Sequence, residues 1–107
     1  MRPTWSDVRQ FCLAQGYVAH RIDPVRYVKL LPDKQTSGTA VSLARVTQTV
    51  PSQMWRLVWQ QQLRLASEAE FWKGLGGEPV QYNIPPHLRH PRTERLSTES
   101  GEEELQP

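Results

Sequence analysis

The chain has 107 residues, 37% of them hydrophobic, which fits one small domain with part of the chain outside its core. No apolar run approaches the roughly 20 residues that cross a bilayer, and no apolar segment follows the N-terminus as in a signal peptide. A single cysteine excludes an internal disulfide framework and a cysteine-rich metal site. We therefore expect a cytoplasmic protein with no membrane partner.

Charge is unevenly distributed along the chain. Residues 1–75 hold ten Lys or Arg against five Asp or Glu, whereas residues 76–107 hold three against six. A basic domain attracts polyanions, and nucleic acid is the commonest polyanion in a cytoplasm. Glycines cluster at 74–77 and prolines recur beyond them. We expect a domain over residues 3–75 and a disordered, Pro-rich acidic tail over residues 76–107.

The first predicted element is a helix over residues 5–15. Thr4 and Asp7 have the spacing of a capping box, and Gly16 suits the position just after the helix. The apolar face repeats every three to four residues and holds Trp5, Val8, Phe11 and Cys12. We expect Cys12 to be a core residue and not a reactive thiol.

Three strands are predicted next, over residues 17–22, 25–30 and 39–46. They are rich in β-branched and aromatic residues. Asp23-Pro24 marks the first turn, and the second connection contains Ser37-Gly38, which we also expect to be a turn. Short connections predict antiparallel neighbours. On the third strand we expect Val41 and Leu43 to face inward.

The second predicted helix begins after Pro51, with Ser52 as its cap, and extends to about residue 65. One stripe of this helix holds Met54, Leu57, Val58, Gln61 and Leu65, and a second holds Trp55, Trp59 and Gln62. Ser67 and Glu70 repeat the capping-box spacing, which predicts a short helix that Gly74 ends.

The predicted fold class is therefore α+β with element order α-β-β-β-α. Three antiparallel strands are backed by two helices, and a short helical turn follows. Such a sheet buries one face and leaves the other open. This is the layout of double-stranded-RNA-binding domains.

The sequence resembles the HicA toxins, small proteins of toxin–antitoxin pairs with a degenerate double-stranded-RNA-binding fold. Three stretches carry the resemblance: a helix that ends at Gly16-Tyr17, a strand–turn–strand over residues 21–28, and a closing helix over 57–65 followed by Ser67 and Phe71 in the pattern Ser-x-x-x-Phe. Together they cover about residues 4–75.

The resemblance implies a protein that cleaves or blocks messenger RNA and binds an antitoxin. The family uses a histidine directly after a Gly-Ser pair at the start of the second strand. Here Pro24-Val25-Arg26 occupies that place, so Arg26 replaces the histidine. A guanidinium stays protonated and is no ordinary general base, but it grips phosphate well. The favoured function is therefore an RNA-binding translational repressor without catalysis.

The candidate RNA-binding residues are the basic side chains expected on the open sheet face and its loops: Arg21, Arg26, Lys29, Lys34 and Arg45. His20 is the only histidine in the domain and is the candidate general base of a metal-independent endoribonuclease, the first alternative. A protein-interaction module with no nucleic-acid role is the second. If the chain has an antitoxin-like partner, we expect its acidic surface to cover the same basic patch. We expect no cofactor, and no metal site at His87 and His90, since no carboxylate or thiol completes a ligand set.

Overall fold

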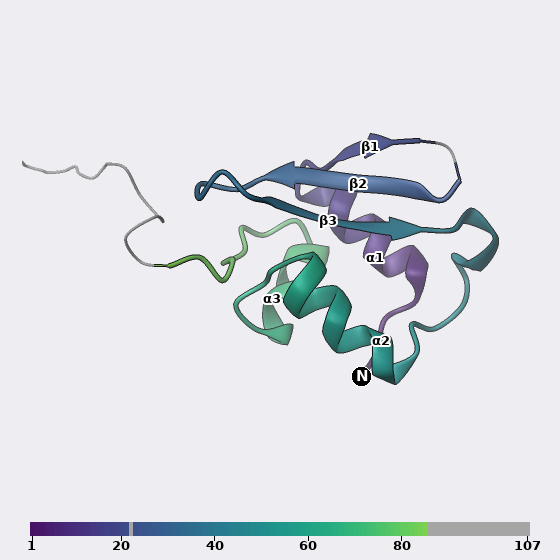
Figure 1. Cartoon of the computed structure of the whole chain (residues 1–107). Coiled ribbons are helices and arrows are strands. Elements are labelled where there is room, and N and C mark those ends of the chain that lie inside the picture. Colours follow the sequence, from purple (N-terminus) through teal and green to yellow (C-terminus); the bar gives the residue numbers. More distant parts are fainter. Residues whose placement is uncertain (22, 86–107) are drawn as a thin grey trace, which may run out of the picture.

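Three antiparallel strands form one sheet in the order β1-β2-β3. The computed structural model describes residues 1–21 and 23–85 of the chain. Strand β1 spans Val18–His20, β2 spans Val25–Leu30 and β3 spans Thr36–Val41. The helices lie on one side of this sheet and leave the other side uncovered (Figure 1). The α+β class and the order α-β-β-β-α predicted from the sequence are confirmed.

Helix α1 (Trp5–Ala14) forms as its sequence predicts. Thr4 Oγ1 accepts a hydrogen bond from the Asp7 amide, and the Asp7 carboxylate accepts one from the Thr4 amide, so the capping box is complete. Gly16 follows the helix with a positive φ of 79°. All four predicted apolar side chains of this helix are buried.

The third strand lies earlier in the chain than predicted. It pairs with β2 from Leu30↔Thr36 to Val25↔Val41, and Leu43–Arg45 forms a 3-10 turn in place of a strand end. The expected turn at Ser37-Gly38 is therefore wrong, because both residues lie in the ladder. Val41 is buried as predicted, whereas Leu43 is exposed.

Helix α2 (Ser52–Arg56) continues into a π-helical segment, η2 (Leu57–Gln62). The Leu63 amide donates to Val58 O, five residues back, at 2.8 Å. This wider turn brings Leu63 inward in place of Gln62. Of the first predicted stripe, Val58 and Leu65 are buried, whereas Met54 and Leu57 are exposed. Ser52 is not the cap, since Pro51 holds that position without a side-chain hydrogen bond.

The last helix, α3 (Glu68–Leu75), starts after Ser67, but the second capping box does not form. Gly74 lies inside this helix and does not end it. The aromatic core joins it to the other helices: the Phe11 and Phe71 rings stack at 5.1 Å between centroids, and Trp55 meets Phe71 edge-on at 4.8 Å.

Residues 78–85 pack against the domain, so the part of the chain outside the core does not begin at residue 76. Tyr82 forms a β-bridge with Leu65, and Ile84 is buried. The Ala66 amide donates to Gln81 O at 3.0 Å. The rest of the expected tail, 86–107, lies outside the described residues. Among the described residues, no helix has the length and apolar character needed to span a membrane.

Candidate nucleic-acid interface

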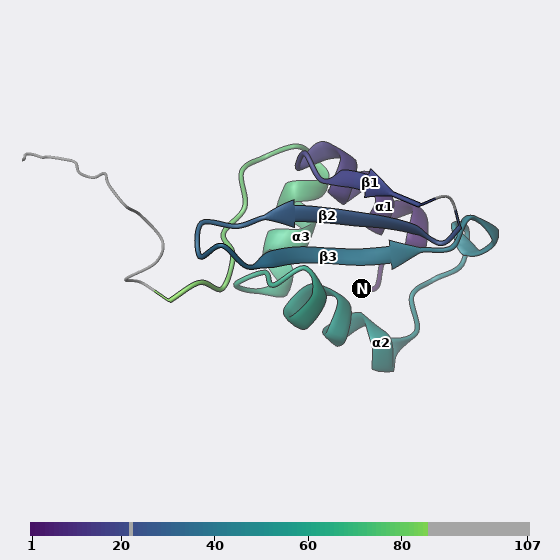
Figure 2. The same cartoon turned by 45° about the horizontal axis from the view of Figure 1, so that its top comes forward.

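His20 and Arg26 lie directly opposite each other on the first two strands. Side chains of opposite residues in an antiparallel pair leave the same face of the sheet, with Cβ atoms about 4.5–5.5 Å apart. Both residues are exposed, and Arg26 alternates along β2 with the buried Tyr27. The pair therefore belongs to the side of the sheet that no helix covers, and Figure 2 shows this side. Among the described residues, the Arg26 side chain has no hydrogen-bond or ion-pair partner. The structure thus brings together His20, the candidate general base, and Arg26, a candidate phosphate-binding residue.

Arg21 and Arg45 lie at the same end of the sheet. Arg21 directly follows β1 and is exposed with a φ of 68°. Arg45 closes the 3-10 turn four residues after Val41, which pairs with Val25 at the start of β2. The segment that follows β3 lies beside the start of β2 in both views (Figures 1 and 2).

We call these four residues, His20, Arg21, Arg26 and Arg45, the basic sheet end. Asp23 is the acidic residue of the same region and is exposed in the β1–β2 connection. Among the described residues, this region therefore carries three guanidinium groups and one carboxylate. This excess of positive charge, presented on exposed side chains, suits a polyanion.

Lys29 does not belong to the open face. It shares its face with Tyr27, which is buried, and its Nζ donates to Gln15 O at 2.8 Å. The same ammonium lies 5.9 Å from the ring centroid of Tyr17 and 5.6 Å from that of Tyr82. Lys29 therefore lies on the helix side of the sheet, and the expectation that it lies on the open face is wrong.

Lys34 lies at the opposite end of the sheet from Arg26. It is exposed in the β2–β3 connection with a φ of 65°. Arg26 is near the start of β2, and Lys34 follows the end of that strand. The rest of β2 lies between them, and a strand advances about 3.4 Å per residue. Lys34 is therefore separate from the basic sheet end.

A groove runs between the outer edge of β3 and the second helix, and Arg26 reaches it from β2. Its volume is about 360 Å³. The strand contributes Gly38, Thr39 and Ala40, and the helical segment contributes Met54 and Gln62. We call this cavity the β3 groove. The sequence had placed Met54 and Gln62 on packed helix stripes, so this cavity was not predicted.

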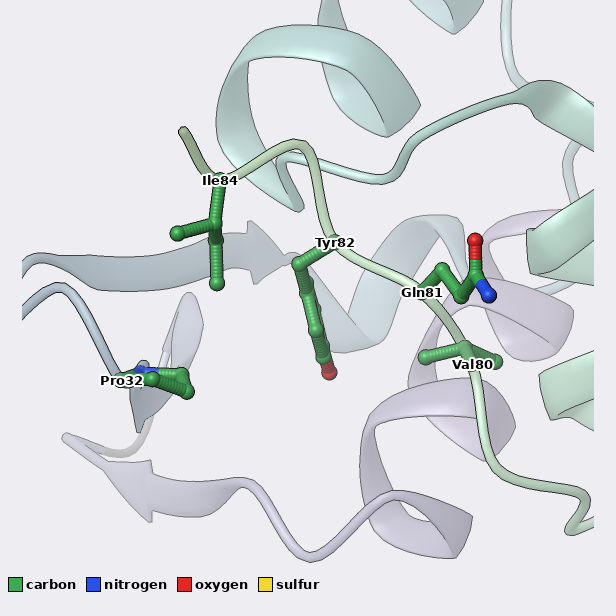
Figure 3. A pocket seen from close by; sticks show the side chains of 5 residues that line it. All are labelled: Pro32, Val80, Gln81, Tyr82 and Ile84. Carbon is green, nitrogen blue, oxygen red and sulfur yellow. The ribbon is translucent and has the colours of Figure 1, made fainter. Parts of the chain in front are cut away.

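A smaller cavity of about 230 Å³ lies between the β2–β3 connection and residues 78–85. Figure 3 shows Pro32 on one side and Val80, Tyr82 and Ile84 on the other, with Gln81 at the edge. Within the part of the chain that the structure describes, no charged side chain lines this cavity, and such a lining does not suit a polyanion.

The remaining candidate chemistry lies inside the fold or outside the described residues. Cys12 is fully buried, and burial raises the pKa of its thiol to about 12, which keeps it protonated and unreactive. Among the described residues, no three His, Cys, Asp or Glu side chains gather as a metal site. His87 and His90 lie outside that part of the chain.

The chain was compared with protein families, curated proteins and solved structures. No family model, curated protein or solved structure matches this chain. The class that the fold defines is thus a small α+β domain with one open sheet face, and the resemblance to the HicA toxins rests on the sequence motifs alone.

Proposed function

We propose that this protein binds RNA through the basic sheet end. The observation that carries the proposal is Arg26, an exposed guanidinium without a protein partner among the described residues, beside two further arginines. Guanidinium groups bind phosphate in a bidentate manner, and such contacts supply affinity without reading sequence. Binding without cleavage represses translation of a bound messenger by blocking the ribosome.

The proposal is tested by fluorescence anisotropy with a labelled RNA in low salt. Arg26→Glu should weaken binding by tenfold or more, since a charge-assisted contact is replaced by repulsion. Lys34→Glu changes the net charge equally at the other end of the sheet and is the matched control. Equal weakening by both substitutions would indicate attraction by net charge alone and would contradict the proposal.

A second candidate function, RNA cleavage, is favoured by the pairing of His20 with Arg26. In such a reaction the imidazole takes the proton of a 2′-hydroxyl, and the 2′ oxygen attacks the adjacent phosphorus. The bond to the 5′ oxygen then breaks, and that oxygen takes a proton from water. The Arg26 guanidinium offsets the charge that develops on the phosphate.

Gel analysis of a labelled RNA separates the two functions. Cleavage by the wild type that His20→Ala abolishes, even at RNA concentrations that saturate the variant, would establish the nuclease. Intact RNA after prolonged incubation, with binding present, would leave binding as the function.

A further inference from the structure

We infer that the β3 groove binds one unpaired nucleotide of a single-stranded RNA. The inference rests on the proposed function and names the form of RNA and the place where one base enters. The groove continues from the basic sheet end, because Arg26 belongs to both. An RNA strand whose phosphates contact Arg26 therefore lies next to this groove, on the side of β3.

The strand side of the groove is flat for a structural reason. Gly38 and Ala40 present almost no side chain, and a Cβ at Gly38 would lie only 2.5 Å from Tyr27 O of the neighbouring strand. Glycine is therefore required there by the close approach of β2, and that requirement leaves the space above it empty. A planar ring fits against such a surface, whereas a branched side chain leaves much of it uncovered.

The helix side offers a polarisable wall. Met54 is 41% exposed although it is a large apolar residue. Trp5 also lines the groove. Thioether sulfur makes favourable contacts with aromatic rings, and every base has an aromatic face. The wall thus contacts a base without a requirement for its sequence.

Gln62 adds hydrogen-bond donors. Its Oε1 accepts from Thr39 Oγ1 at 2.6 Å, which fixes the orientation of the amide. The Nε2 group then keeps two N–H donors, for which the described residues provide no acceptor. Carbonyl oxygens and ring nitrogens at the edge of a base are suitable acceptors.

The charge of the groove favours a nucleotide over an apolar peptide. Arg26 is the only charged side chain that the described residues contribute to its lining, and it is cationic. A peptide side chain packed against Met54 leaves the guanidinium and the Gln62 amide without partners, whereas a nucleotide supplies a phosphate to one and a base edge to the other. A duplex keeps its bases stacked and paired, so it cannot place one in a cavity of this size.

The methyl group of Met54 reports on the groove directly. The chain has two methionines, and Met1 is fully exposed, so it serves as an internal control in the same spectrum. We expect single-stranded oligouridine to shift the Met54 methyl resonance and not that of Met1. A blunt RNA duplex of the same length should shift amides of the basic sheet end and leave both methyl groups in place.

A substitution that fills the groove should weaken the binding of single-stranded RNA. Ala40→Leu places a larger side chain over the strand surface, whereas Ala44→Leu adds the same atoms at an exposed position outside the groove. Ala40→Leu should weaken single-stranded RNA binding by about tenfold, the loss expected for one stacked base, and change duplex binding less than twofold. Ala44→Leu should change neither.

The outcomes separate this inference from the function on which it rests. RNA that shifts the basic sheet end but not the Met54 methyl in the wild-type protein would overturn the groove and leave RNA binding intact. RNA that shifts neither would overturn both. Because the methyl measurement uses the unaltered chain, it decides the question even where Ala40→Leu fails to fold.

Discussion

At the scale of single residues, the contact between Arg64 and Asp33 ties the chain after the π-helical segment to the β2–β3 connection. The guanidinium donates to both carboxylate oxygens, at 2.5 and 3.3 Å. Arg64 adopts a φ of 59°, which is unfavourable for a residue with a side chain, so surrounding contacts must hold it there. The hydrogen bonds from Arg64 also hold the pKa of Asp33 below its usual value.

This pKa shift predicts a pH dependence of stability. Because the folded pKa of Asp33 is lowered, its contribution is fully present above the ordinary value of 3.8 and is lost as pH falls through the folded value. Asp33→Asn should thus lower the free energy of unfolding at neutral pH and converge with the wild type in acid. Urea titrations from neutral pH to about pH 2 measure this.

Asp23→Asn is the control for this prediction, since Asp23 is exposed and has no ion pair among the described residues. A constant gap between Asp33→Asn and the wild type across the whole pH range would show that the carboxylate charge is not what stabilises the contact.

The Cys12 thiol makes a second prediction at this scale. Its burial and its pKa of about 12 predict that a disulfide reagent at mildly basic pH labels no thiol in the native protein and one thiol in denaturant. Spectrophotometric titration with a chromogenic disulfide measures both values. Rapid labelling of the native protein would contradict the packing of α1.

At the scale of elements, Gly74 is where α3 approaches α1 and the segment after it. A Cβ at this position would lie 2.5 Å from Phe11 Cε2 and 2.5 Å from Val80 Cγ1. Overpacking at this position should cost about 1–3 kcal/mol. Alanine regains roughly 1 kcal/mol in a helix interior, so Gly74→Ala should lower the free energy of unfolding by up to about 2 kcal/mol.

Gly76→Ala is the matched control for this substitution. The nearest atom to a Cβ there is Lys73 O at 3.6 Å, an ordinary contact, and its φ is −82°. Thermal melts of both variants measure the contrast. Equal melting temperatures for the two would mean that α1 and α3 are not packed this closely.

Local signals were sufficient for α1 and β2, and long-range contacts decided the rest. The cap of α1 is formed by Thr4 and Asp7, which lie three residues apart, so the sequence shows both partners. The start of β3 depends instead on Ser37, whose hydroxyl donates to Leu63 O at 2.7 Å from 26 residues away. This distant hydrogen bond allows the polar Ser37 side chain to be buried in the core. The residues next to Ser37 in the sequence give no sign of such a partner.

The candidate site was predicted in part. Alternation along β2 places Arg26 on one face and Lys29 on the face of Tyr27, and this signal was sufficient to exclude Lys29. Alternation of Val80, Tyr82 and Ile84 was likewise a signal that residues 78–85 pack. The β3 groove had no such signal, because its helix wall depends on the π-helical turn at Leu57–Gln62.

At the scale of the whole molecule, residues 78–85 form the last part of the core that the structure describes. Tyr82 OH lies 3.2 Å from Tyr17 OH, and the Gln15 side chain donates to Glu78 O at 2.9 Å. Ile84 is only 5% exposed. The domain is therefore complete only when this segment is present.

Two truncations test this dependence. A chain of residues 1–85 retains this segment and serves as the reference for urea unfolding. A chain of residues 1–77 should lose at least about 2 kcal/mol, since the apolar side chains of the segment are no longer buried. Equal stability of the two truncated chains would contradict the packing of residues 78–85.

The most direct test of RNA binding at the basic sheet end is an amide NMR titration of the full chain with a short single-stranded RNA in low salt. We predict shifts at His20, Arg21, Arg26 and Arg45 that weaken steeply as salt is added, while Lys34 at the other end of the sheet stays in place. Shifts centred on Lys34, or none at saturating RNA, would contradict binding at the basic sheet end.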